Sequence, residues 1–111
     1  AASLKLFDYL GDSKITQAKT DIQTLSKAIE LYRMDNGSYP EELNQLMIQE
    51  DAEEGQSKAY LKKLVKDPWG NDYAYLPIDE STYELISYGR DGEEGGEDLD
   101  ADITNMEESL E

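Results

Sequence analysis

The sequence predicts an α+β domain in which one long N-terminal helix packs on a small antiparallel sheet. An apolar residue recurs every three or four positions near the N-terminus, which is typical of one face of an α-helix. That stripe comprises Ile15, Ala18, Ile22, Leu25, Ile29 and Tyr32. Further along, residues 73–78 and 82–88 are rich in aromatic and β-branched residues and are separated by Asp79-Glu80-Ser81. Two such runs joined by a short polar turn predict a β-hairpin.

We place the helix at residues 5–34. Its apolar stripe slips at Gly11-Asp12-Ser13, where we expect the helix to be weakened. Gly37 can adopt the left-handed conformation that ends a helix, because it has no Cβ. Pro40 follows shortly after and keeps the residue before it out of the α region. The chain is therefore expected to leave the helix in an extended conformation.

Between the helix and the hairpin, residues 35–66 are expected to form a variable loop region. A short helix is predicted at 41–49, because Leu43, Leu46 and Met47 can face inward. Polar residues dominate 51–57, which we expect to be a loop. Another helical turn is predicted at 60–64. The hairpin unit is placed at 67–88, because its first residues, Asp67-Pro68-Trp69-Gly70-Asn71, are typical of a turn.

Length and charge set limits on what this chain does. Its 111 residues suit one domain. A net charge of -16 and a pI near 4.1 argue against nucleic acid or an anionic membrane as a partner, since both attract positive surfaces. The chain begins Ala1-Ala2-Ser3-Leu4, so we expect residues 1–4 to be vector-derived and a natural start to have been removed. We expect residues 5–111 to form a single domain.

The composition also excludes several chemistries. There is no His and no Cys, which removes the commonest general base, the Ser-His-Asp triad and most zinc sites. Paired carboxylates can hydrolyse glycosides, but that reaction needs a sugar-binding cleft. A domain with one helix and a small sheet has little room for such a cleft, so we expect no enzyme activity.

The segment from Asp91 to Asp102 contains seven acidic residues, three glycines and no basic residue. It is either a solvated acidic tail or a site for a hard cation, since calcium takes six to eight oxygen ligands. It is not an EF-hand, because position 5 of that motif would be Gly95 and position 12 would be Asp102 instead of Glu. In an extended segment Asp100 and Asp102 point the same way, and the glycines allow Asp91 to return over them.

Several motifs occur in an order that is specific. Residues 31–40 read Leu-Tyr-Arg-Met-Asp-Asn-Gly-Ser-Tyr-Pro, and 67–70 read Asp-Pro-Trp-Gly. They are followed by Tyr83-Glu84-Leu85-Ile86-Ser87-Tyr88-Gly89, then Asp91-Gly92 and Asp102-Ile103. Over about residues 12 to 104, this combination resembles the major pseudopilin family of bacterial type II secretion systems. One departure is Glu41-Glu42-Leu43, which stands where Gln-Gly-Leu is usual in the family.

The resemblance implies a type IV pilin-like fold and a structural role. It implies a hydrophobic N-terminal helix that is cleaved and methylated, that anchors the full-length protein in the inner membrane and that is missing here. The domain would then lie in the periplasm. Through that helix, copies would polymerise into a pseudopilus with minor pseudopilins and other secretion components, to help export folded proteins across the outer membrane. The alternatives are a pilin of a related type IV pilus-like filament and a free calcium-binding module.

The resemblance also implies that the loop at 89–104 binds a calcium ion, leaving 105–111 as a tail. Asp91 and Asp102 match the family's ligands directly. A third acidic ligand usually lies just before the second, where this chain has Ala101, so Asp100 is the expected substitute. Main-chain carbonyl ligands are expected from Tyr88 and, less firmly, from Glu93.

Overall fold

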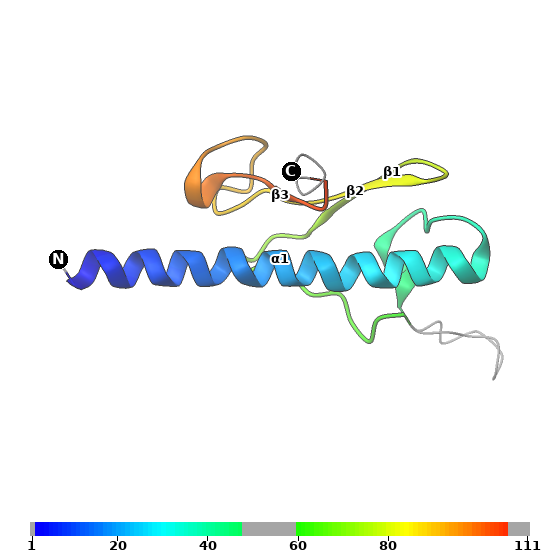
Figure 1. Ribbon diagram of the computed structural model, residues 1–111, viewed down its shortest axis with the longest axis horizontal. Helices are drawn as coiled ribbons and strands as arrows, with labels where there is room; N and C mark the ends of the chain where they lie inside the picture. The colour runs from blue at the N-terminus through cyan, green and yellow to red at the C-terminus, as the bar shows by residue number, and fades with distance from the viewer. Residues whose placement is uncertain (1, 48–59, 107–111) are drawn as a thin grey trace.

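One long helix lies along the molecule, and a small sheet packs on one side of it (Figure 1). The computed structural model describes residues 2–47 and 60–106, with side-chain burial from residue 13 onward. The helix is α1 (Ala2–Asn36), and the strands are β1 (Ala74–Asp79), β2 (Thr82–Ser87) and β3 (Ile103–Thr104). Two short 3-10 helices, η1 (Leu43–Leu46) and η2 (Asp98–Asp100), complete the described elements. The predicted α+β class is confirmed.

The predicted apolar stripe forms the helical side of the core. Ala18, Ile22 and Ile29 are buried against residues of the sheet and of η1, including Leu85 and Leu46, which are both 0% exposed. Burying one leucine or isoleucine side chain contributes about 1.5–3 kcal/mol, so this stripe holds the helix on the sheet. No helix among the described residues is both long enough and apolar enough to cross a membrane.

The ends and the continuity of α1 differ slightly from the prediction. The helix is unbroken through residues 11–13 and extends beyond the predicted 5–34 at both ends. Its C-terminal end has the predicted cap, since Gly37 has φ +86° and donates its N–H to the carbonyl of Arg33 at 2.7 Å. That bond satisfies one of the last carbonyls of the helix.

The sheet is antiparallel with the order β1-β2-β3. The predicted hairpin is confirmed, with Tyr75 paired to Leu85 and a register shift between Pro77 and Asp79. Tyr75 lies on the face toward the core and donates its hydroxyl to the carbonyl of Pro40 at 2.6 Å. The third strand was not predicted. It has only two residues, which is too short for an alternation of apolar and polar residues to be recognised.

The connecting region contains one wrong prediction and one that is partly right. The helix expected at 41–49 is a 3-10 helix, η1, and the expected helical turn at 60–64 is absent. The N–H groups of Tyr60 and Leu61 both donate to the carbonyl of Leu46, at 2.9 and 3.0 Å, so this segment bonds to η1 instead of to itself. The loop expected at 51–57 lies outside the described residues.

Candidate functional site: the loop between β2 and β3

The acidic segment is a loop that connects β2 to β3, drawn in orange in Figure 1. Ser87 pairs with Ile103 across the two antiparallel strands. Continuing this register by one residue sets Tyr88 opposite Asp102, because partners in an antiparallel ladder move in opposite directions along the chain. The structure therefore places two of the predicted calcium ligands at the same end of the loop.

A buried carboxylate fixes the start of this loop. Asp67 is only 4% exposed, and its Oδ1 accepts the backbone N–H groups of Trp69 at 3.0 Å and Asn71 at 2.9 Å. Its Oδ2 accepts the hydroxyl of Ser87 at 2.8 Å. The oxygen of Ser87 in turn accepts the N–H of Gly89 at 3.3 Å. These bonds connect the turn before the hairpin to the base of the acidic loop.

The two arms of the loop cross closely, and we call the crossing residues the neck: Gly89, Arg90, Leu99, Asp100 and Ala101. Gly89 has φ +77°, and a Cβ there would lie 2.7 Å from the carbonyl oxygen of Ala101. Such a contact is too short for any side chain, so the crossing requires glycine. The N–H of Arg90 donates to the carbonyl of Leu99 at 2.8 Å. The neck is therefore closed by the backbone itself.

The predicted third ligand, Asp100, is paired with Arg90. Nε of Arg90 lies 2.9 Å from Oδ1, and Nη2 lies 3.0 Å from Oδ2, so the guanidinium binds both carboxylate oxygens. Charge-assisted bonds in this forked arrangement are stronger than neutral ones. The guanidinium beside Asp100 holds the pKa of that carboxyl below its ordinary value, and the carboxylate raises the pKa of Arg90.

The other two predicted carboxylates make only backbone contacts. Asp102 accepts the N–H of Gly95 with both oxygens, at 3.2 and 3.1 Å, and Asp91 accepts the N–H of Glu93 at 3.1 Å. Neither forms an ion pair with a basic side chain of the described residues. Their oxygens are of the kind that calcium takes, although the positive charge of Arg90 is close enough to Asp91 to attract it.

The structure does not gather the predicted ligands into one cluster. Within residues 2–47 and 60–106, no three acidic side chains lie close enough together to hold a metal ion. Asp91 and Asp102 fit a calcium site by their chemistry, whereas both oxygens of Asp100 are already bonded to Arg90. The calcium site therefore stays a prediction.

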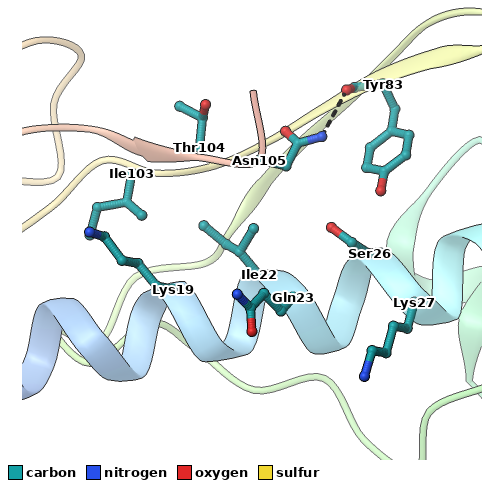
Figure 2. Close-up of a pocket in the computed structure, with 9 residues that line it drawn as sticks. All are labelled: Lys19, Ile22, Gln23, Ser26, Lys27, Tyr83, Ile103, Thr104 and Asn105. Atoms are coloured by element: carbon teal, nitrogen blue, oxygen red, sulfur yellow. Dashed lines mark hydrogen bonds between the residues drawn. The ribbon is translucent and has the colours of Figure 1, made fainter. Parts of the chain in front are cut away.

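Asn105, which follows β3, is a further residue that the sequence did not reveal. Its side-chain oxygen accepts the N–H of Leu85 at 2.8 Å, and its amide donates to the carbonyl of Tyr83 at 3.1 Å, the dashed line in Figure 2. Its backbone N–H donates to the carbonyl of Leu85 at 3.2 Å. Asn105 thus continues the pairing of β3 with β2 beyond the end of the strand.

A groove runs between α1 and the β3 segment beside Asn105 (Figure 2). Ile22 and Ile103 are its apolar residues, and Lys19 belongs to its helical side. Ser26 of α1 and Tyr83 of the sheet line another part of it (Figure 2). The groove adds no carboxylate to the predicted ligands, because its polar lining residues are neutral or basic.

Signals for two of the missed residues were present in the sequence. Arg90 is the only basic residue among the seven acidic ones of the loop, which makes it an obvious partner for a carboxylate. Asp67 begins a turn-rich run, where an aspartate commonly accepts backbone N–H groups two residues ahead. The role of Asn105 had no comparable signal, since it depends on contacts with β2.

A long helix on a small antiparallel sheet with a closed loop after it defines a pilin-like domain. The crystal structure of the major pseudopilin from the type 2 secretion system of enterohaemorrhagic Escherichia coli has the same fold. Its TM-score is 0.67 at 28% identity, over 90% of this chain and 92% of that one. Residues 5–106 match the family described as type II secretion system (T2SS), protein G. This chain belongs to that family, the major pseudopilins.

Relatives of known identity agree with this assignment. The chain is 42% identical over 103 residues to the type II secretion system core protein G of Pseudomonas aeruginosa, covering 86% of this chain and 72% of the relative. It is 43% identical over 96 residues to the core protein G of Vibrio cholerae, covering 80% of this chain and 66% of the relative. The chain thus spans about two thirds of the length of the Vibrio relative.

Proposed function

We propose that this chain is the globular part of a pseudopilus subunit, which polymerises to help export folded proteins across the outer membrane. The observation that carries the proposal is the family match over residues 5–106. The role is structural and not enzymatic. The pilin-like fold supports it, because a long helix with a small domain on one side can pack against copies of itself.

In the full-length protein, a hydrophobic N-terminal helix would anchor the subunit in the inner membrane, with this domain in the periplasm. Cleavage and methylation of that helix would precede assembly with minor pseudopilins and other secretion components. Exposed apolar side chains on the domain support contacts with other copies. Leu31 and Met34 on α1 are 51% and 79% exposed, and Leu76 and Ile78 on β1 are similarly open. Clustered exposed apolar residues commonly mark interaction surfaces.

Complementation tests the assembly role. The natural full-length gene is expressed in a bacterium that lacks its own major pseudopilin, and export of a secreted enzyme into the medium is measured. We expect secretion to be restored. A full-length protein that accumulates in the inner membrane yet restores no secretion, in a host whose other components are intact, would count against the proposal. The empty vector and the host's own gene are the two controls.

Calcium binding to the loop at 89–104 is the second part of the proposal. Asp91 and Asp102 would supply carboxylate oxygens, Asp100 a third when Arg90 releases it, and Tyr88 and Glu93 main-chain carbonyls. The seven acidic residues of this loop repel one another, and only one basic residue lies among them. A divalent cation would offset that repulsion and hold the two arms of the loop together.

Thermal unfolding with calcium and with a chelator tests this part. A ligand that binds only the folded state stabilises it by about 2.7 kcal/mol at a hundredfold excess over Kd. We expect the unfolding midpoint to rise with calcium and the rise to be lost in Asp91→Asn and in Asp102→Asn. Glu94→Gln is the matched control, because it removes one negative charge from the same exposed loop without removing a predicted ligand. An unchanged midpoint in the original protein would rule out calcium stabilisation.

A further inference from the structure

The turn of the β1–β2 hairpin is acidic, apolar and exposed. Asp79 and Glu80 lie at the turn, and Ile78 beside them is 56% exposed. Leu76, two residues earlier in β1, is 53% exposed. Residues 74–87 contain three acidic side chains and no basic one. We call Leu76, Ile78, Asp79 and Glu80 the hairpin tip, which presents apolar surface and negative charge together.

Tyr39 holds the hairpin tip in place. Its hydroxyl lies 3.2 Å from the carbonyl oxygen of Ser81, the second residue of the turn. The backbone N–H of Ser81 also donates to Oδ1 of Asp79 at 2.8 Å. The ring of Tyr39 packs edge-on against that of Tyr83, with 5.0 Å between the ring centroids. The tip is therefore preorganised, so a partner that binds it has little conformational freedom to remove.

The groove between α1 and the β3 segment has the opposite charge. Its volume is about 390 Å³, it contains Lys19 and Lys27, and none of the described residues that line it is acidic. Ile22 and Ile103 form its apolar part. In Figure 2 the side chain of Lys19 extends from α1 toward the β3 segment. Neither lysine forms an ion pair within the described part of the chain. The groove therefore offers apolar surface and positive charge, which complement the hairpin tip.

The distribution of charge favours a second copy of this chain as the partner of the groove. Five basic and five acidic residues lie in α1, so the rest of the chain carries the whole net charge of -16. Copies therefore repel one another wherever their sheets and loops meet. A contact between the hairpin tip of one copy and the α1 groove of another brings opposite charges together instead, and it removes exposed apolar side chains from water.

We propose that the hairpin tip of one subunit docks in the groove of the next subunit. Ile78 then packs on the apolar part of the groove, and the two acidic residues of the tip lie beside its two lysines. The contact joins two different surfaces, and such contacts build a filament when they do not close into a ring. In Figure 1 the turn lies over the C-terminal part of α1 and β3 over its middle, so each subunit presents both surfaces. This inference rests on the proposed pseudopilus role and names a contact within it.

Disulfide cross-linking in cells that produce the full-length protein tests the contact. This chain has no cysteine, so introduced thiols report on their own positions. Ser81→Cys places one thiol at the turn and Gln23→Cys places one in the groove, and both residues are exposed, so the core stays intact. A protein with both substitutions should form a ladder of dimers, trimers and longer oligomers on oxidation. Either substitution alone should form no ladder.

Thr24→Cys is the matched control for Gln23→Cys. Thr24 is also exposed, but it is turned by about 100° around the helix and does not line the groove. Together with Ser81→Cys it should therefore give no ladder. Dimers from Ser81→Cys alone would indicate a contact between two tips, and they would overturn the proposal.

Charge reversal measures the same contact independently. In the protein with thiols at positions 23 and 81, Glu80→Lys should lower the yield of cross-links by about fivefold, the upper end of what an exposed ion pair contributes. Lys19→Glu should have a similar effect. The two reversals together restore opposite charges and should recover most of the yield. Lys66→Glu is the control, because Lys66 pairs with Asp72 outside the groove. Independent effects of the two reversals, without recovery, would contradict the pairing.

The secretion assay separates this contact from the proposed function. If the original full-length protein restores secretion but the paired thiols at positions 23 and 81 give no ladder, the contact is wrong and the pseudopilus role stands. If the original protein restores no secretion, the role itself fails. Cross-links from Gln23→Cys to a host protein of another mass would show that the groove binds a different partner, which would also overturn the proposal.

Discussion

The hydroxyl of Ser87, at the end of β2, donates a hydrogen bond of 2.8 Å to Oδ2 of Asp67, a carboxylate that is 4% exposed. Twenty residues separate the two in the chain. The bond joins the turn that opens the hairpin to the point where the acidic loop leaves the sheet. The candidate site therefore depends on a buried carboxylate that is not itself one of the predicted ligands.

Asp67→Asn should destabilise the protein by about 2 kcal/mol. The amide keeps the size of the side chain but has one acceptor oxygen in place of two, so at least one of the three donors around it loses its partner. A buried donor without a partner costs about 1–3 kcal/mol. Urea unfolding in the presence of a chelator measures the change. Asp72→Asn is the control, because its exposed pair with Lys66 should be worth at most 1 kcal/mol. Equal midpoints for the two variants would contradict the role assigned to Asp67.

Gly89→Ala should destabilise far more than Gly95→Ala. Both glycines have positive φ, +77° and +88°, so an alanine at either position is strained by about 1 kcal/mol. At Gly89 the new Cβ would also lie 2.7 Å from the carbonyl oxygen of Ala101, whereas nothing lies within 4 Å at Gly95. We expect a further loss of about 1–3 kcal/mol from that clash. Comparison of the two urea midpoints checks it, and similar values would show that the neck can relax.

The helix and the hairpin could be predicted because their signals are local. The stripe from Ile15 to Tyr32 repeats for several turns, and residues 73–78 and 82–88 are two runs of strand-forming residues joined by a short polar turn. The pair Ile103–Thr104 is a strand only because β2 lies beside it. Likewise, the N–H groups of Tyr60 and Leu61 bond to the carbonyl of Leu46 and do not form the predicted helical turn. In both places the backbone conformation depends on contacts between segments, which a local sequence pattern does not reveal.

The candidate site could be predicted only in part, because the loop is visible in the sequence but the contacts within it are not. The acidic residues and glycines between Asp91 and Asp102 mark the loop in the sequence. Which carboxylates face one another depends on how the loop crosses itself, and that crossing is set by Gly89 and by the Arg90 contact. Alternation along an extended segment suggested that Asp100 and Asp102 act together, but residues 98–100 form a 3-10 helix.

Tyr73→Phe should lower the stability by about 1.5–3 kcal/mol. The hydroxyl of Tyr73 donates a bond of 2.6 Å to Oδ2 of Asp21 and so connects the start of the sheet to α1. Bonds to a charged group are worth about 1.5–3 kcal/mol, and phenylalanine preserves the buried ring. Urea unfolding measures the loss. Tyr88→Phe is the control, since that hydroxyl makes no bond to the described residues, and equal effects of the two substitutions would contradict the prediction.

Stability should fall as the pH rises above 10, and Tyr75→Phe should reduce the slope. Burial raises the pKa of Tyr75 to about 12, against 10.0 for a free tyrosine. The folded protein therefore keeps a proton that the unfolded chain loses, so this contribution is complete below pH 10 and is lost as the pH rises toward 12. The limiting slope is about 1.4 kcal/mol per pH unit for one such tyrosine. Urea unfolding between pH 9.5 and 11.5 compares the two proteins, in which every other titrating group is the same. Parallel pH profiles for the two proteins would mean that the Tyr75 hydroxyl has the same pKa in the folded and unfolded states, which would contradict the prediction.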